Sequence, residues 1–302
     1  MENVISVEGL TKSYAGKKAV DGVSFTVRKG EIFGLLGPNG AGKTTTLECL
    51  EGLRVPDGGT LRVMGVDPLR EPRRLQSLIG VQLQSSGLPA TIKVREAMQF
   101  FSAYHRVEPR MDLLERFNLM EKKEGEFHTL STGQQRRLAL ALAVAHEPAV
   151  LFLDEPTAGG EVASRTELHR LMEELKAAGT TIILSTHDMA EAEELSARVA
   201  ILLQGRITAV GSPRELTATG SGLTKISVRT ARDSAAGKSF PGVVKEVQRE
   251  EYRIFYTRDI GPSVSAIIAS IESSQDALID LRVERPTLEE RFLELTKEGV
   301  VS

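Results

Sequence analysis

The chain has 302 residues, of which 41% are hydrophobic and 26% charged, and its formal net charge is −3. This length suits one large domain and a smaller one. The net charge is small and the basic residues occur in pairs rather than runs, which excludes the footprint of a nucleic-acid-binding protein. The single cysteine, Cys49, excludes a disulfide within the chain and indicates a reducing compartment.

No membrane-spanning segment is expected. The first residues, MENVISVEGL, lack the basic start and apolar stretch of a signal peptide. The longest apolar run is LALALAVA at 138–145, whereas a transmembrane helix needs about 20 apolar residues.

The first part of the chain predicts strands that lead into a glycine-rich loop. Two runs rich in β-branched and aromatic residues, VSFTV and EIFGLL, flank Lys29 and Gly30, and we expect them to form a strand pair. KTTTLECLEGL then has helical spacing and ends near Gly52, while TLRVMG and LIGVQL predict further short strands.

The middle of the chain predicts helices and then a buried parallel sheet. Helical periodicity extends from Thr91 to about Ala145. After it, AVLFLD, TTIILST and VAILL are continuous apolar runs, which are typical of parallel strands buried on both faces. The helical segments ELHRLMEELKAAG and MAEAEELSA separate these runs, and this alternation predicts a doubly wound α/β domain.

The end of the chain predicts a separate α+β unit. A turn-prone segment, TATGSG, lies at 217–222. After it come three predicted strands (KISVRT, GVVKEVQRE and YRIFYTR), a helix (SVSAIIASIES), a strand (ALIDLRVE) and a final amphipathic helix (TLEERFLELTKEG). We therefore expect two domains, at 1–219 and 220–302.

GPNGAGKTT is a phosphate-binding loop by its spacing, which matches G-x-x-x-x-G-K-[ST]. Its glycines allow backbone N–H groups to surround phosphate oxygens, and the following helix adds its dipole. The alternative is a tight turn that binds nothing, but the strand before it and the helix after it favour the phosphate site. We expect Lys43 to bridge the β- and γ-phosphates and the Thr44 hydroxyl to ligate Mg²⁺. The nucleotide-binding residues expected in this loop are Gly37, Pro38, Asn39, Gly40, Ala41, Gly42, Lys43, Thr44 and Thr45.

AVLFLDEP places two carboxylates, Asp154 and Glu155, at the end of a buried strand. We expect Asp154 to hold Mg²⁺, directly or through water, and Glu155 to act as the base that polarises the attacking water. Adjacent acids after a strand are also common as helix N-caps. The phosphate loop in the same chain favours the catalytic interpretation.

LSTGQ, at 130–134, begins a second helix whose start is suited to an anion. The free N–H groups and the helix dipole at Ser131, Thr132 and Gly133 favour negative charge. An ordinary capped helix is the alternative, because serine and threonine are good N-caps.

These three motifs, in this order, resemble those of the nucleotide-binding subunits of ATP-binding cassette (ABC) transporters, over about residues 3–216. The resemblance implies a P-loop ABC ATPase domain of α/β class with a RecA-like core, an antiparallel strand subdomain and a helical subdomain, followed by the small α+β domain. ATP and Mg²⁺ are the implied cofactors. It also implies a homodimer that encloses two ATP molecules and hydrolyses them when closed. The residues that would face the partner's γ-phosphate are Ser131, Thr132, Gly133 and Gln134.

The resemblance assigns roles to further residues. Tyr14 matches an aromatic residue that stacks on adenine, and His187 matches a histidine that contacts the γ-phosphate. Gln84 matches a glutamine that touches Mg²⁺ and communicates with the membrane partner, although Gln82 is close enough to compete for that role. Asp188 is expected to cap the MAEAEELSA helix instead.

The sequence departs from the family pattern at two places. Thr132 stands where glycine is usual in the signature sequence, and Gly160 and Glu161 stand where leucine and aspartate usually follow Glu-Pro-Thr-Ala-Gly. Neither change alters the phosphate loop, so we expect ATP binding to be retained. Coupling between the two sites of a dimer is the property that these changes would affect.

Within the family, TLECLEGLRVPDGGTLRVMGVDP and PTLEERFLELTKEG resemble the ATPase subunits of bacterial drug exporters of the daunorubicin-resistance type. This resemblance implies export of a drug-like or hydrophobic compound through a separate integral membrane permease. The subunit would then lie at the cytoplasmic face of the plasma membrane. The C-terminal domain is interpreted as regulatory or dimer-stabilising.

Three alternatives are open at this point: another P-loop enzyme such as a GTPase or a kinase, a soluble ABC protein, and an ATP-sensing module. A GTPase is disfavoured because no Asn-Lys-x-Asp guanine-binding pattern is present, and a small-molecule kinase would not account for LSTGQ. A soluble ABC protein of translation or DNA repair would usually hold two cassettes or a long coiled-coil insertion. An ATP-sensing module without enzymatic activity is motivated by the altered loop at Gly160 and Glu161.

Overall fold

The computed structural model describes residues 2–84, 87–159, 162–218 and 223–298. The chain divides into two compact units, Met1–Pro213 and Arg214–Ser302. The domain boundary expected between 219 and 220 lies outside the described residues, as do Gly160 and Glu161. Within the described ranges, no helix combines the length and the apolar character needed to span a membrane.

The first unit is built around a six-stranded sheet in the order β5-β6-β7-β3-β8-β9. The first five strands are parallel, and β9 runs antiparallel to β8. β3, β6 and β7 are buried along their whole length, as their continuous apolar sequences predict. The strands are β3 (Ile32–Leu36), β5 (Ile79–Gln82), β6 (Val150–Asp154), β7 (Thr181–Thr186), β8 (Arg198–Leu203) and β9 (Arg206–Gly211).

A second sheet, three-stranded and antiparallel, has the order β2-β1-β4. Its strands are β1 (Asn3–Tyr14), β2 (Lys17–Arg28) and β4 (Gly58–Val63). The prediction that the strands on either side of Lys29 and Gly30 pair with each other is therefore wrong. These strands, β2 and β3, both exist but belong to different sheets. Apolar periodicity predicts that a strand exists, but it does not specify the neighbouring strand. β1 and β9 are two strands that the sequence patterns did not predict.

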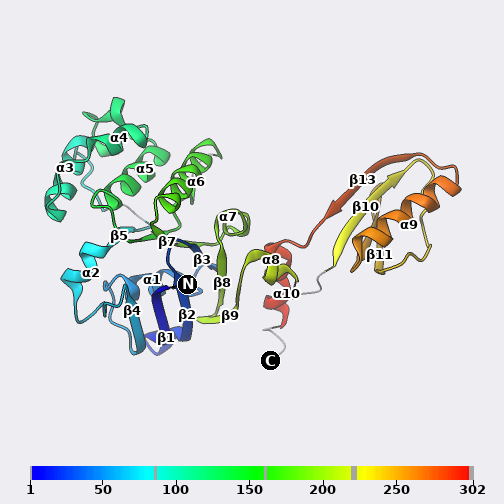
Figure 1. Cartoon of the computed structure of the whole chain (residues 1–302), viewed down its shortest axis with the longest axis horizontal. Coiled ribbons are helices and arrows are strands. Elements are labelled where there is room, and N and C mark those ends of the chain that lie inside the picture. The colour runs from blue at the N-terminus through cyan, green and yellow to red at the C-terminus, as the bar shows by residue number, and fades with distance from the viewer. Residues whose placement is uncertain (1, 85–86, 160–161, 219–222, 299–302) are drawn as a thin grey trace. The chain divides into compact units, whose positions relative to one another are not determined.

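The central sheet separates two apolar cores, because alternate residues of a strand face opposite sides. On one side, Leu151 and Leu153 pack with the helices of the middle segment. On the other, Phe152 packs with α1 (Lys43–Leu50) and the antiparallel sheet. Figure 1 shows α3 to α6 gathered on one side of this unit and α1 with the antiparallel strands on the other. The remaining helices of the unit are α2 (Pro72–Leu78), α3 (Val94–His105), α4 (Met111–Arg116), α5 (Thr132–Ala143), α6 (Val162–Ala177) and α7 (Met189–Leu195).

The second unit contains the predicted α+β elements. Its four-stranded antiparallel sheet has the order β11-β12-β10-β13. Phe255 of the sheet packs with Ile267 and Ile271 of α9. Its strands and helices are β10 (Thr224–Thr230), β11 (Val243–Arg249), β12 (Tyr252–Thr257), α9 (Ile260–Ser273), β13 (Leu278–Glu284) and α10 (Leu288–Glu298), and α8 (Pro213–Ala218) spans the division.

Close packing of α5 on β5 predicts that Gly80 tolerates no side chain. A Cβ atom at Gly80 would lie 2.2 Å from the backbone oxygen of Ala143. We expect Gly80→Ala to lower the free energy of unfolding by about 1–3 kcal/mol, because one element has to move away from the other. Urea denaturation followed by circular dichroism measures this change. Gly87→Ala is the control, since no atom lies within 4 Å of a Cβ there; equal stability of the two variants would contradict the predicted overpacking.

Candidate functional site

The glycine-rich loop connects β3 to the N-terminus of α1, as predicted. Gly42 has a φ of +104° and serves as the N-cap of α1 without a side-chain cap. A Cβ atom at Gly42 would lie 2.4 Å from the oxygen of Ala19, and one at Gly37 would lie 2.3 Å from the oxygen of Leu202. The loop therefore requires glycine at both positions. It leaves the N–H groups at the start of α1 available to an anion.

Lys43 is buried at the centre of this loop. Its Nζ atom donates to the backbone oxygen of Gly37 at 2.8 Å and lies 3.2 Å from Oε1 of Glu155. Its ammonium group is therefore held between the loop and the acidic residue that follows β6. A positive charge at this position suits phosphate oxygens that enter the loop.

Thr44 and Asp154 meet although they are far apart in the sequence. The Thr44 hydroxyl donates to Oδ2 of Asp154 at 2.8 Å, and the Ser185 hydroxyl donates to Oδ1. These hydroxyl and carboxylate oxygens are the hard donors that Mg²⁺ prefers, and Mg²⁺ usually combines one or two carboxylates with substrate phosphates. The donor set therefore fits the implied metal.

Glu155 has a left-handed backbone with a φ of +47°, which is strained for a residue with a side chain. Its Oε1 faces Lys43, and its Oε2 lies 3.2 Å from Nδ1 of His187. Burial, the largest influence, raises the pKa of Glu155, but Lys43 and His187 together outweigh it and hold the pKa below its usual value. Glu155 is consequently ionised at neutral pH and able to accept a proton.

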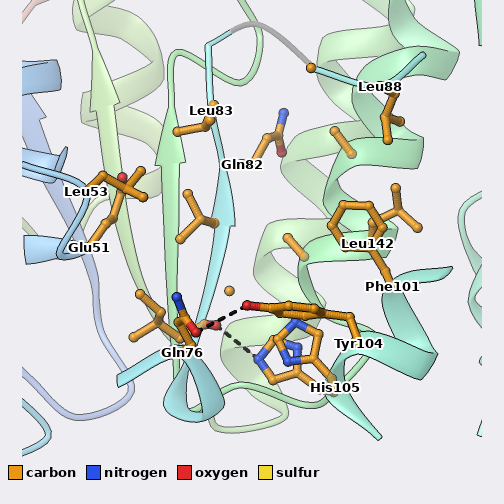
Figure 2. Close-up of a pocket in the computed structure, with 17 residues that line it drawn as sticks. Glu51, Leu53, Gln76, Gln82, Leu83, Leu88, Phe101, Tyr104, His105 and Leu142 are labelled. Carbon is orange, nitrogen blue, oxygen red and sulfur yellow. Dashed lines mark hydrogen bonds between the residues drawn. The ribbon is translucent and has the colours of Figure 1, made fainter. Parts of the chain in front are cut away.

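A cavity of about 470 Å³ brings together half of the site residues expected from the sequence. It contains Gln84 but not Gln82, whose side chain is buried at the end of β5 and lines a different cavity (Figure 2). Tyr14 also lines it, with the Arg54 guanidinium 5.2 Å from the centre of its ring. The lining residues are Tyr14, Ala19, Asn39, Gly40, Gly42, Lys43, Thr44, Thr45, Gln84 and Glu155.

The residues of LSTGQ do not line this cavity. Ser131 is exposed and caps α5: its hydroxyl accepts from the Gln134 N–H at 3.2 Å, and the Gln134 side chain accepts from the Ser131 N–H at 3.0 Å. Thr132 is exposed at the first turn of the helix. A Cβ atom at Gly133 would lie 1.9 Å from Oγ of Ser164. The segment is thus a capped helix start that does not line the phosphate cavity of its own chain.

Two further residues near the site are Asp188, whose capping role was predicted, and Arg136, which was not predicted. Asp188 caps α7 by accepting from the N–H groups of Ala190 and Glu191, which confirms the prediction for it. Arg136 of α5 was not predicted as a site residue. Its guanidinium donates to the backbone oxygen of Glu155 at 2.8 Å and to the backbone oxygen of Ala158 at 2.7 Å. No sequence signal identifies such contacts between a side chain and a distant backbone.

Comparison with known proteins gives consistent relationships. The family model described as ABC transporter matches residues 20–158. The chain is 34% identical over 305 residues to the daunorubicin resistance ATP-binding protein DrrA3 of Streptomyces coeruleorubidus, covering 98% of this chain and 96% of that protein. It is 37% identical over 302 residues to the Nod factor export ATP-binding protein I of Ralstonia nicotianae, covering 97% and 94%.

A solved structure gives the same relationship. The structure of cbiO1 from Clostridium perfringens, described as part of the ABC transporter complex cbiONQ, aligns with a TM-score of 0.64 and 30% sequence identity. The alignment covers 72% of this chain and 92% of that one. From the near full-length relatives, the loop and the acidic strand end, we conclude that the chain belongs to the ABC transporter family and is an ATPase.

Proposed function

We propose that this chain is the ATP-hydrolysing subunit of an exporter, that it dimerises around two ATP molecules, and that it drives a separate integral membrane permease. The observation that carries the proposal is a separation within one chain. Lys43, Thr44 and Glu155 converge on one cavity, whereas Ser131 and Thr132 are exposed outside it. A second chain, placed head to tail, would bring its own α5 N-terminus to the open side of that cavity.

Each residue near the loop has a distinct task in this proposal. The loop N–H groups and Lys43 bind the phosphate oxygens, and Tyr14 stacks on the adenine. Thr44, Asp154 and Gln84 would hold Mg²⁺, which would supply positive charge to neutralise the phosphates of the nucleotide.

Glu155 is the catalytic base of the proposed reaction. Its carboxylate orients the attacking water and accepts its proton, while His187 contacts the γ-phosphate. Contacts with Lys43 and His187 keep the carboxylate ionised before the reaction. Arg136 binds the backbone oxygens of Glu155 and Ala158, on either side of Pro156, and so positions the base.

The proposed partner and cargo follow the relatives. One relative is named for daunorubicin resistance and another for Nod factor export. We infer that this subunit lies at the cytoplasmic face of the plasma membrane, bound to its permease, and that the permease exports a drug-like or hydrophobic compound. The C-terminal unit is proposed to regulate the dimer or stabilise it.

Replacement of the proposed base separates binding from turnover. We expect Glu155→Gln to retain ATP binding, to lower kcat by about 10²- to 10⁴-fold, and to accumulate as an ATP-bound dimer, because the amide cannot accept the proton. Phosphate release and size-exclusion chromatography with ATP measure these effects. Exposed Glu121→Gln is the control; turnover by Glu155→Gln at the rate of that control would remove Glu155 from the base role.

Dilution tests the requirement for two chains. Specific ATPase activity is expected to rise with protein concentration, because each site is completed by the partner's helix. The measurement pairs a rate series with light scattering at each concentration. A constant specific activity down to concentrations at which only monomer is present would argue against shared sites.

Thr132, which stands where glycine is usual in LSTGQ, allows the proposed role of this segment in dimerisation to be tested. Because Thr132 is exposed and does not line the cavity, Thr132→Gly should leave ATP affinity of the monomer within about twofold and change the ATP-dependent dimerisation constant. Equilibrium binding of a fluorescent ATP analogue and analytical ultracentrifugation report the two quantities separately. A large loss of ATP binding by the monomeric variant is the contrary result.

A further inference from the structure

A cluster of three buried polar side chains connects the loop that carries Glu155 to two helices. Its members are Thr157 of that loop, His169 of α6 and Glu191 of α7, which are 8%, 8% and 2% exposed. None of these three residues lines the nucleotide cavity. Buried polar groups require partners, and these side chains are partners of one another.

Glu191 is the centre of this cluster. Its Oε1 accepts a hydrogen bond from the Thr157 hydroxyl at 2.7 Å and lies 3.3 Å from Nε2 of His169. Its Oε2 is buried and has no hydrogen-bond partner within the described part of the chain. The burial of Glu191 is therefore compensated mainly by its contacts with Thr157 and His169.

His169 contacts two carboxylates of the same helix. Its Nε2 faces Oε1 of Glu191, and its Nδ1 lies 3.2 Å from Oε2 of Glu194. A neutral imidazole carries one N–H and donates to only one of them, whereas the imidazolium donates to both. The hydrogen bond with Glu191, the largest influence, raises the pKa of His169; Glu194 acts in the same direction, and burial opposes both. These carboxylates therefore favour the protonated ring, which joins α6 to α7.

Other charged groups near the cluster are engaged elsewhere. Arg136 of α5 acts electrostatically on Glu191, but its guanidinium donates to backbone oxygens. Arg165 of α6 pairs with Asp188 at the start of α7. Among the described residues, His169 is thus the titratable group that touches Glu191 and whose protonation changes the charge of the cluster.

The cluster reaches the proposed catalytic base through the backbone. Thr157 lies two residues after Glu155, whose side chain faces Lys43 and His187 and whose φ is +47°. Such a strained conformation persists only where the surrounding structure holds it. The Thr157 hydroxyl contributes to this, because it ties the loop to Glu191.

We propose that His169 is a positioning residue for hydrolysis: its protonated ring holds Glu191 against Thr157, and Thr157 holds the loop in the conformation that places Glu155 at the cavity. Turnover then depends on the protonation of His169, whereas ATP binding does not, because the cluster lies outside the nucleotide cavity. The inference rests on the proposed role of Glu155 as the base, and it adds a proton-linked control of that residue.

The direction of the pH effect follows from the raised pKa of His169. Its ion pairs are fully formed below the pKa of a free histidine, about 6.5, and are lost as pH rises through the higher pKa of the folded chain. The contact between α6 and α7 is therefore strongest in mild acid and weakens in the alkaline direction. Glu155, whose pKa is lowered, stays ionised throughout this range.

The first test compares the whole wild-type chain with His169→Gln, whose amide donates a hydrogen bond but cannot be protonated. Both kcat and the dissociation constant of a non-hydrolysable ATP analogue are measured from pH 6 to pH 9. The ratio of wild-type kcat to variant kcat cancels the pH effects of other groups. We expect this ratio to be about 3–10 at pH 6 and to approach 1 at pH 9, with dissociation constants within about twofold.

Arg170→Gln is the matched control, because it removes a cation from the next, exposed position of α6 and should follow the wild type. Nuclear magnetic resonance of labelled histidine gives a readout besides activity. The His169 ring signal, identified by its loss in His169→Gln, should titrate above pH 6.5 and should move to lower pH in Glu191→Gln. A kcat ratio that does not change with pH, or a wild-type His169 that titrates at or below pH 6.5, would overturn the proposal.

Variants of Thr157 test the route to the loop. Thr157→Ser keeps the hydroxyl and should retain the wild-type profile, whereas Thr157→Val should lower kcat by about 3- to 10-fold at pH 6. Adding His169→Gln to Thr157→Val should cause no further loss, because both changes break one connection. A full additional loss would show that His169 does not act through Thr157, contrary to the proposal.

Glu155→Gln, assayed in the same series, separates this inference from the proposed function. If Glu155→Gln turns over like its Glu121→Gln control while the kcat ratio still changes with pH, the role of Glu155 fails and the link from His169 to the loop stands. If Glu155→Gln is inactive and the ratio is constant, the positioning role of His169 fails.

Discussion

The contact between Thr44 and Asp154 is the interaction on which the rest of the site depends. Thr44 lies in the first turn of α1, which follows β3, and Asp154 is the last residue of β6. β7 lies between β3 and β6 in the sheet. The parallel register places the ends of the three strands at one edge of the sheet, and Ser185 of β7 completes the link from there. The sheet itself therefore fixes the positions of the glycine-rich loop, Thr44, Asp154 and Glu155.

The groups at the same edge explain why the carboxylate of Glu155 is ionised although it is buried. Burial alone would raise the pKa of Glu155, and the contacts from Lys43 and His187 reverse that effect. Glu51, at the end of α1, shows the opposite outcome: burial raises its pKa to about 8, and the nearby acids Asp154 and Glu48 act in the same direction. Two buried glutamates in one domain thus differ in charge because of their neighbours.

Much of this arrangement could be predicted from the sequence, because the loop spacing, the buried strands and the acidic strand end are local patterns. The assignment of β2 and β3 to different sheets could not, since strand pairing depends on distant residues. The sequence also could not decide whether Gln82 or Gln84 lies in the phosphate cavity. Gln82, the last residue of β5, is buried, whereas Gln84 beyond the strand lines the cavity. Arg136 was missed because its partners are backbone oxygens, which carry no side-chain signal.

The central claim is that each chain lends the N-terminus of α5 to the nucleotide held by its partner. Asn39 and Thr132 are exposed, and the native Cys49 is buried, so chains with Asn39→Cys and with Thr132→Cys can be mixed and oxidised with a non-hydrolysable ATP analogue. We expect a disulfide-linked dimer that depends on nucleotide and on the presence of both variants. A yield no greater than that of either variant alone would contradict the account.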